Sequence, residues 1–481
     1  MHTLRFATSL WPYAVVTTLA AMVPTLFWRG GILENEATYF ILQYTAERPL
    51  LHKIFDPHTN DFHTYQAREL SYFVDYLDAM VYTTVTGRIE PSFFIPGSAI
   101  LAWVLFALVF MRATRSTARH IDPLTGALVL ACFASSFVFI STFGMFYRSG
   151  KLLVGVAVIA FLFHLRRVQQ ARSRDTPMRP QWLTRQGLVA FSLTLVAGLL
   201  DRQGVFYALM ACAILLLHFV RTRELRDLLL AAGAATVLLQ VYNLWLAPVL
   251  IHRLNGYWPS FEYQTIPGDQ IALLPAHTLA ASQMLAENAS VLLGGTWPVT
   301  IAFLGVVIVL LLRAHGRATQ KATSSWRLPE LLRGISGCTV AYVALVAIGH
   351  IVMFALMIAR HPYIYDLDHR YWYYPIPYLA VLVFAGVGGL NAVLSRSGPR
   401  ERQVIQVALL VVVIGNLANL PYYSRFMTGG GHFEAVFAQT ELLKASLRQN
   451  RADPGLVKQY EDFFRHAAPL RRSILQSSGE R

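Results

Sequence analysis

Blocks of about 18 to 25 apolar residues, separated by short arginine-rich loops, make up most of this sequence. An α-helix needs about 20 apolar residues to cross the hydrocarbon core of a bilayer, so each block has the length of a membrane span. Hydrophobic residues occupy 55% of the 481 positions and charged residues only 14%. In soluble proteins about a quarter of the residues are charged. The sequence therefore predicts an all-α protein with many membrane spans.

Eleven blocks fit membrane spans and predict one transmembrane domain over residues 1–421. The first block follows a weakly basic start without a clear cleavage site, so we expect it to stay as the first span. The fourth and fifth blocks are short for a full crossing, and we expect them to extend into polar neighbours, to tilt or to break. The blocks lie near 8–28, 93–111, 123–143, 152–165, 187–200, 204–220, 227–250, 290–312, 335–359, 375–394 and 403–421.

Basic residues in alternate loops predict how the spans are oriented. One set of loops contains twenty Lys and Arg residues, and the opposite short loops contain six. Because loops rich in Lys and Arg stay in the cytoplasm, the first set is assigned to that side, and the N-terminus with it. The arrangement is that of a bacterial inner-membrane protein, and the same bias explains the net charge of +14 without nucleic acid. The six outer basic residues are Arg148, Lys151, Arg202, Arg253, Arg360 and Arg370.

The first long outer loop, residues 29–92, is acidic in an otherwise basic chain. Residues 29–90 contain nine of the 27 Asp and Glu residues. From Leu70 onward, apolar residues recur at the spacing of an amphipathic helix. We expect this helix to lie along the membrane surface with its polar face in water. That polar face carries Arg68, Ser71, Asp75 and Asp78.

Residues 422–481 form a small tail, which eleven spans place outside the cytoplasm. One candidate helix runs from about Phe433 to Gln449. A second begins at Asp453, where the aspartate caps the helix and Pro454 takes the first turn. We therefore expect a helical appendage to the transmembrane domain.

Glu34 and Glu36, just after the first span, are the candidate catalytic residues. A carboxylate at the boundary between membrane and water can act as a general base toward a hydroxyl acceptor. In a helix the two side chains would point about 200° apart, so only one can face a central cavity. Glu36 would share its side with Tyr39 and Gln43, which become cavity candidates. Solvated charge at the end of a span is the alternative interpretation.

Basic residues of the outer loops are the candidate phosphate ligands. Arg370 lies among aromatic residues in the segment 360–377, and a guanidinium group there can hold a phosphate through two hydrogen bonds. Arg148 and Lys151, in the short loop after the third span, are candidates for the same role.

Asp201 and Arg202 directly follow the fifth span. Charged groups at the edge of hydrocarbon are costly unless they are paired or functional. Two interpretations stay open: the two charges neutralise each other, or they line an outward-facing cavity, where Arg202 could hold a phosphate. Asp61 in the first outer loop and His369 in a late one are further cavity candidates.

Two Asp-x-His units in the acidic loop leave a divalent metal open as a cofactor. Carboxylate and imidazole groups are suitable ligands for such an ion. A polar surface loop explains the pattern equally well, and no other cofactor is predicted. The four residues are Asp56, His58, Asp61 and His63.

The layout of the chain resembles the GT-C superfamily of integral membrane glycosyltransferases, which use polyprenyl-phosphate sugar donors. A first span precedes a long acidic outer loop with surface helices, and some eleven spans follow in all. A late outer loop carries Arg370, followed by Pro375 and Pro377 and then by the next span. The resemblance covers the layout of most of the chain.

A short motif in the first loop supports this resemblance. Many GT-C members carry Asp-Glu-x-x-Tyr there, and the Asp is usually the base. The matching window runs from Asn35 to Tyr39, in which Glu36 and Tyr39 fit and Asn35 replaces the Asp. Since an asparagine cannot accept the proton, the resemblance assigns the base to Glu36 or Glu34.

The resemblance implies a defined reaction on the outer side of the membrane. The lipid of the donor would lie between spans, and basic residues would hold its phosphate: Arg370 first, then Arg148, Lys151 or Arg202. A first-loop carboxylate would activate the hydroxyl of a glycan, lipid or protein acceptor. Transfer would invert the anomeric carbon and release polyprenyl phosphate.

Three other functions stay open. O-antigen ligases and polymerases also use polyprenyl-linked donors, but they usually place their large outer loop late, whereas here it is early and acidic. Transporters or flippases of lipid-linked sugars tend to show repeated halves or matched broken helices, and the sequence shows no such symmetry. Asn35 also leaves open a catalytically silent protein with this fold.

Overall fold

The computed structural model describes residues 10–27, 44, 49–55, 67–86, 96–117, 121–144, 148–172, 184–259, 266–319, 337–360, 375–395 and 397–428. All regular secondary structure in these segments is helical. The acidic pair after the first span, the late aromatic loop and the predicted helices of the tail lie outside the described residues.

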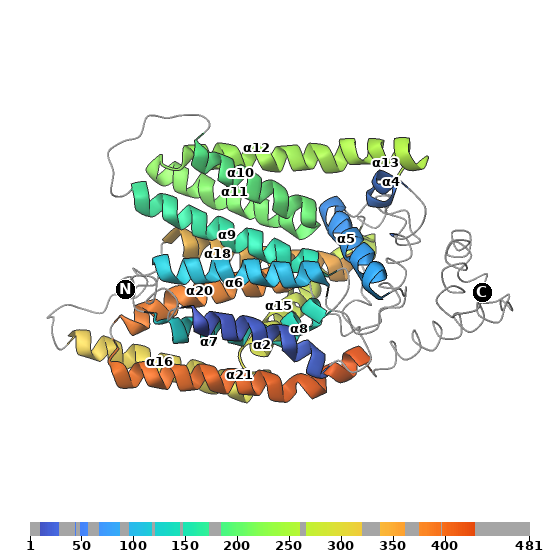
Figure 1. Cartoon of the computed structure of the whole chain (residues 1–481). Helices are drawn as coiled ribbons and strands as arrows, with labels where there is room; N and C mark the ends of the chain where they lie inside the picture. The colour runs from blue at the N-terminus through green and yellow to red at the C-terminus, as the bar shows by residue number, and fades with distance from the viewer. Residues whose placement is uncertain are drawn as a thin grey trace, which may run out of the picture.

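Most helices of the bundle overlap the predicted apolar blocks and pack side by side (Figure 1). The helix over residues 274–292 was not predicted, because nearly all of it lies between the blocks 227–250 and 290–312. The helices of the bundle are α2 (Trp11–Phe27), α6 (Gly97–Thr117), α7 (Pro123–Ala134), α8 (Phe137–Gly144), α9 (Ser149–Arg172), α10 (Arg185–Leu200), α11 (Arg202–Thr222), α12 (Arg226–Val241), η2 (Tyr242–Leu246), α13 (Ala247–Asn255), α15 (Leu274–Leu292), α16 (Trp297–Thr319), α18 (Gly337–Arg360), α20 (Ile376–Leu394) and α21 (Pro399–Thr428). The other helices are α4 (Leu50–Ile54), α5 (Glu69–Thr86) and α14 (Gly268–Ala272).

Five helices of the described part are long and apolar enough to cross a membrane. A sixth candidate is the bent pair of α15 and α16, if the pair is one span. The side chains on the outside of the bundle agree with this, because α12 and η2 expose Val237, Leu244 and Trp245. Large apolar side chains that are exposed along the outside of a helical bundle indicate a membrane protein.

The fourth predicted block is a longer helix than its apolar residues indicated. The block 152–165 lies within α9, which has 24 residues and continues through Arg166 and Arg167 into the basic loop. The fifth block, 187–200, lies within α10, which has 16 residues. Extension into polar neighbours is therefore confirmed for α9.

Two predicted continuous helices are broken in the structure. The block 290–312 contains a bend of 75° between α15 and α16. Gly294 and Gly295 lie at this bend with φ of +117° and +73°, a backbone conformation that glycine adopts without strain. The block 123–143 is interrupted at Ser135 and Ser136, between α7 and α8.

The densest part of the core is aromatic and joins α6, α7 and α8. Trp103 lies 4.7 Å from Phe139, and Phe106 lies 4.8 Å from Phe133, measured between ring centroids. All four rings are fully buried. Stacked and tilted aromatic pairs of this kind contribute about 0.5–1.5 kcal/mol beyond the area that they bury.

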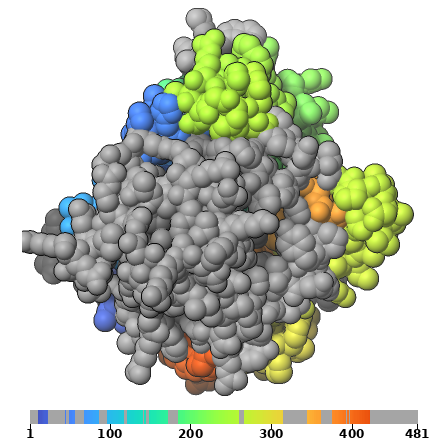
Figure 2. All heavy atoms as spheres, turned by 90° about the vertical axis from the view of Figure 1, so that its right-hand side faces the viewer, coloured from blue at the N-terminus to red at the C-terminus, as the bar shows by residue number. Residues whose placement is uncertain are grey.

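Helix α5 lies across one end of the bundle, which we call the α5 end; α4 and α13 lie at the same end (Figure 1). Asn255 of α13 fixes α4, since its Nδ2 donates to the Phe55 carbonyl at 2.8 Å and its Oδ1 lies 3.2 Å from His52 Nδ1. Figure 2 looks at this end and shows the blue atoms of the 49–86 region beside the lime-green atoms of α13.

The predicted amphipathic helix exists as α5, but its orientation corrects the prediction. Asp75 is 0% exposed, whereas Val85 on the apolar face is 72% exposed. The expectation that the polar face lies in water is therefore wrong. Periodicity identified the two faces, but charged groups of α9 and of the α10–α11 junction cover the polar one. The remaining buried polar residues are Glu69, Ser71 and Asp78, and the remaining exposed apolar residues are Leu77, Met80 and Val81.

Candidate functional site

Six charged residues come together beneath α5, and we call them the charged cluster. Three cations and three carboxylates are contributed by α5 with the residue before it, by the start of α9, and by the junction of α10 and α11. Their side chains are almost completely removed from solvent, which is rare for charged residues unless they are paired. The cluster consists of Arg68, Asp75, Asp78, Arg148, Lys151 and Asp201.

Asp201 forms the central ion pair of the charged cluster. Its Oδ2 lies 2.7 Å from Lys151 Nζ and 3.7 Å from Arg68 Nε. Its Oδ1 accepts a hydrogen bond of 3.0 Å from the Gln203 backbone and so caps α11. Burial opposes ionisation of this carboxyl, but Lys151 and Arg68 outweigh burial and lower its pKa below the ordinary value. Asp201 is therefore held as a carboxylate.

Asp78 links α5 to two neighbouring helices. Its Oδ1 accepts from the Ser98 backbone N–H at 3.0 Å, and its Oδ2 accepts from the Ser98 hydroxyl. The same hydroxyl lies 2.7 Å from Ser149 Oγ at the start of α9. Burial raises the pKa of Asp78, and the hydrogen bonds from Ser98 oppose that effect. This carboxyl thus joins α5, α6 and α9.

Asp75 differs from the other two carboxyls because it lacks a direct partner. Within the described residues neither of its oxygens has a hydrogen-bond partner, and the side chain is fully buried. Arg68 and Arg148 act on it through their charge, as does Asp78. Burial raises its pKa to about 8. A carboxyl with a pKa near the working pH can both hold and release a proton, as a general acid or base must.

Close packing of α5 on α9 depends on a glycine. A Cβ atom at Gly150 would lie 1.8 Å from Ser71 Oγ, far inside van der Waals contact. Ser71 itself is buried. The missing side chain at position 150 therefore lets the polar face of α5 reach the start of α9.

The start of α5 is also fixed from the other side. Glu69 forms a hydrogen bond with the side chain of Tyr242, where the π-helical turn η2 begins. Ala67 packs with Ala247 and Ile251 of α13 in a small apolar cluster. Two independent contacts thus hold the residue between them, Arg68, in place.

A second buried group lies next to the charged cluster on α18. His350 is fully buried, and its Nδ1 lies 3.0 Å from the hydroxyl of Tyr207 on α11. The Tyr378 ring stacks against it at 5.2 Å, and the charge of Lys151 acts on it. His350 extends the polar site from α9 and α11 to α18.

The structure brings together three of the site residues expected from the sequence, Arg148, Lys151 and Asp201. The sequence left two interpretations of Asp201, neutralisation by Arg202 or a place in an outward-facing cavity. The cation that lies 2.7 Å from its carboxylate is Lys151 and not the expected Arg202, and the cavity stays a prediction. Arg202 is the first residue of α11 and is half-buried. The other expected site residues, outside the described segments, are Glu34, Glu36, Tyr39, Gln43, Asp61, His369 and Arg370.

Sequence reasoning missed Arg68, Asp75, Asp78 and His350 as members of the site. The first three had a usable signal, since all lie on one face of the predicted helix from Leu70. That face was assigned to water because nothing in the sequence shows which segment covers it. His350 gave no signal beyond being a polar residue within an apolar block.

No group of three His, Cys, Asp or Glu side chains in the described segments is arranged to hold a metal ion. The candidate metal ligands Asp56, His58, Asp61 and His63 lie outside those segments. Within the described part, the chemistry of the site is that of buried cations and carboxyls.

Such a site can bind an anion and exchange a proton. Buried cations attract an anionic group strongly because water does not screen them. Comparison of the chain with protein-family models, with curated proteins and with solved structures finds no match.

Proposed function

We propose that the chain is a membrane glycosyltransferase. It transfers a sugar from a polyprenyl-phosphate donor to a cell-envelope glycan, lipid or protein on the extracytoplasmic side. The charged cluster carries this proposal, because a buried group of three cations beside a protonatable carboxyl suits a phosphate-linked donor and a hydroxyl acceptor. The resemblance of the layout to the GT-C superfamily supports the same function.

The proposed topology has eleven crossings, with the N-terminus in the cytoplasm of a bacterial cell and the α5 end outside the inner membrane. The bias of Lys and Arg toward the opposite loops supports this orientation. In this topology α7 with α8 forms one crossing, and α15 with α16 contributes another. The charged cluster then lies at the outer end of the bundle, on the side of the membrane where polyprenyl-linked sugars serve as donors without nucleotides.

The charge balance of the cluster favours binding of a phosphate. A pKa of about 8 keeps Asp75 largely protonated at neutral pH. Asp78 is engaged by Ser98, and Asp201 by Lys151. Glu69, the other buried carboxylate of α5, is engaged by Tyr242. The three cations of the charged cluster then face two carboxylates of the cluster, and a donor phosphate can be held there through charge-assisted hydrogen bonds. Arg148, Lys151 and Arg68 are the proposed ligands in the described part, and Arg370 and Arg202 are proposed to assist them.

The proposed reaction is a single displacement. The acceptor hydroxyl attacks the anomeric carbon and gives its proton to a carboxylate of the 29–92 loop. The bond from the anomeric carbon to the phosphate oxygen breaks, and polyprenyl phosphate leaves with those electrons. Glu36 or Glu34 accepts the proton according to the GT-C resemblance. Asp75, from the same loop, is a third candidate, but only in its ionised form, which a pKa of about 8 makes the minor form at neutral pH.

One observation favours a second candidate function, the transport of lipid-linked sugars. Broken helices are common at the binding sites of transporters, and α15 and α16 meet at a bend of 75°. A transporter would move the intact donor across a bilayer and leave its glycosidic bond unbroken. Assays of the protein in vesicles distinguish the two functions by the release of polyprenyl phosphate.

Equilibrium binding tests the phosphate site directly. The purified full chain should bind polyprenyl phosphate more tightly than polyprenol of the same length. Arg148→Gln should reduce that preference about tenfold, because a charge-assisted contact is lost. Arg253→Gln changes an exposed cation at the same end of the bundle and should have no effect. Equal affinity of the wild-type protein for the two lipids would contradict the proposal.

A further inference from the structure

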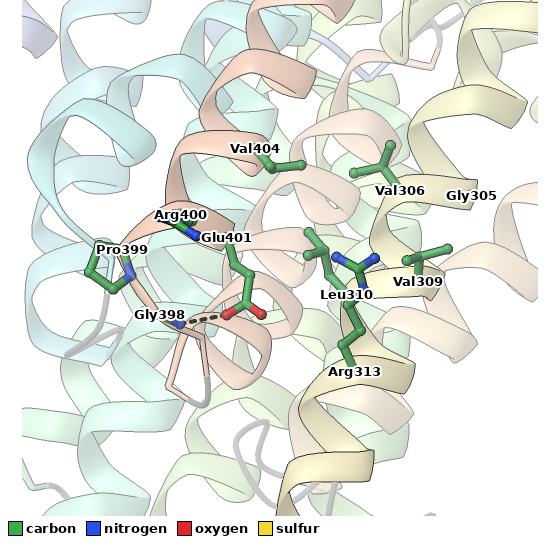
Figure 3. A pocket seen from close by; sticks show the side chains of 10 residues that line it. All are labelled: Gly305, Val306, Val309, Leu310, Arg313, Gly398, Pro399, Arg400, Glu401 and Val404. Atoms are coloured by element: carbon green, nitrogen blue, oxygen red, sulfur yellow. Dashed lines mark hydrogen bonds between the residues drawn. The ribbon is translucent and has the colours of Figure 1, made fainter.

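A groove lies between α16 and α21, at the end of the bundle opposite to α5 (Figures 1 and 3). Its volume is about 810 Å³. Figure 3 shows that the two helices form facing walls, with the guanidinium group of Arg313 pointing into the space between them. The lining residues are Gly305, Val306, Val309, Leu310, Arg313, Gly398, Pro399, Arg400, Glu401 and Val404.

The groove changes from apolar to basic along its length. The residues that line it on α16 run from Gly305 to Arg313, which is about 12 Å at 1.5 Å per residue. Val306 and Val404 lie at one end, and Arg313 lies at the other with the start of α21 (Figure 3). A molecule that fits this gradient has an apolar body and an anionic head.

The apolar end is continuous with the outer surface of the bundle. Val309 is 47% exposed and Val404 is 46% exposed. Both helices continue this surface with further exposed aliphatic residues, which would face lipid in a membrane. The residues are Ile301, Leu304, Ile308 and Leu312 on α16, and Val407, Leu410, Val411 and Ile414 on α21. A ligand can therefore enter the groove sideways from the bilayer.

The basic end keeps its positive charge despite one nearby carboxylate. Arg313 and Arg400 are both exposed. Glu401 is buried and accepts a hydrogen bond of 2.6 Å from the Gly398 backbone N–H, so it caps the start of α21. Two guanidinium groups and one engaged carboxylate leave a net positive charge where the apolar walls end.

We propose that this groove binds an anionic glycerophospholipid from the leaflet at this end of the bundle. One acyl chain lies along Val306, Val309 and Val404, and the head-group phosphate contacts Arg313 and Arg400. Basic sites between membrane helices bind anionic head groups in this way, and the apolar walls distinguish a lipid from a free phosphate. The site is separate from the charged cluster and does not depend on the proposed glycosyltransferase activity.

Native mass spectrometry of the full chain in detergent tests the charge requirement. The wild-type protein should retain phosphatidylglycerol at least tenfold more tightly than phosphatidylcholine with the same acyl chains. The double variant Arg313→Gln/Arg400→Gln should lose that preference, because the two guanidinium contacts are removed. Arg221→Gln, an exposed cation at the end of α11, should keep it.

A glycine of the groove tests the apolar part without changing charge. A Cβ at Gly305 meets no atom within 4 Å, so Gly305→Leu should fold normally and fill the groove. Phosphatidylglycerol affinity should fall at least tenfold. Gly233→Leu on α12, where a Cβ also meets nothing within 4 Å, is the matched control and should bind as the wild type does.

Four results would overturn the proposal: equal affinity for the two lipids, an unchanged preference in the arginine double variant, unchanged binding in Gly305→Leu, or displacement of the lipid by millimolar inorganic phosphate. The last result would assign the arginines to a free anion. Thermal unfolding of each variant verifies that the fold is intact, and the exposed arginine variants keep the test valid if Gly305→Leu is unstable.

Discussion

The two ends of the bundle use basic residues in opposite ways. At the α5 end, Lys151 is buried and lies 2.7 Å from the Asp201 carboxylate. At the other end, Arg313 and Arg400 are exposed beside an apolar groove. A buried charge is costly without its partner, whereas an exposed one is solvated wherever it points. A ligand at the α5 end would therefore compete with Asp201 for Lys151, whereas a ligand at the other end would meet guanidinium groups that are exposed to solvent.

The largest expected effect comes from breaking the buried ion pair. Lys151→Met should destabilise the protein by about 3–5 kcal/mol, because Asp201 stays buried with only Arg68 nearby. Denaturant unfolding in detergent micelles measures the loss. Arg253→Met removes an exposed cation at the same end and should change stability by less than about 0.5 kcal/mol.

A double variant sharpens this prediction. Lys151→Met/Asp201→Asn removes both charges and keeps an asparagine that can still cap α11. It should recover part of the stability lost in Lys151→Met, because neither charge of the Lys151–Asp201 pair is left buried without the other. A double variant as unstable as the single one would show that the pair matters for packing rather than for charge.

The next effect in size, measured per pH unit, concerns Asp75. Its pKa is about 8 in the folded protein, above the ordinary value of about 3.9. Between these values the unfolded chain has released this proton while the folded protein holds it. Stability should therefore fall by up to about 1.4 kcal/mol per pH unit as the pH rises through that window, and level off above pH 8.

Asp75→Asn tests this contribution because it cannot ionise. Unfolding of the variant should be less sensitive to pH between about 4 and 8 than unfolding of the wild type. The measurement is the denaturation midpoint at several pH values in that range. Identical pH profiles for the two proteins would show that Asp75 is ionised in the folded state.

The smallest effect of the three concerns the close approach of α5 to α9. Gly150→Ala should destabilise by about 1 kcal/mol, the low end for overpacking, because Ser71 Oγ is a side-chain end that can rotate away. Gly233→Ala has open space around it and should be neutral or slightly stabilising, as alanine favours helix. A larger loss at position 233 than at position 150 would contradict the assigned packing.

Sequence patterns predicted where most helices lie, but not what covers each face of a helix. The periodicity from Leu70 predicted α5 within a residue of its observed start at Glu69. It could not show that the polar face is buried, because periodicity identifies two faces and not what covers them. In a bundle whose outside is apolar, the polar face of a helix can find its partners inside.

Site residues were predicted where their position in the chain indicates a role. They were missed where only a contact with a distant part of the chain indicates one. Asp201 lies at the end of an apolar block, where charge is costly, and Arg148 and Lys151 lie in a short outer loop, where basic residues are candidate phosphate ligands. Arg68 joins Asp201 across more than a hundred residues of sequence, and no local pattern predicts such a contact. The break at Gly294 and Gly295 was also missed, because the apolar pattern over 290–312 predicts one continuous span.

Asn416 connects the two broken helices. This buried residue of α21 accepts a hydrogen bond from Gly294 N–H at 2.9 Å, and its amide donates to the carbonyls of Leu292 and Cys132 at 3.1 and 3.0 Å. The side-chain amide of Asn416 thus holds both the bend between α15 and α16 and the end of α7 through hydrogen bonds. A displacement of Asn416 would disturb both breaks at once, so the two breaks share one buried polar anchor.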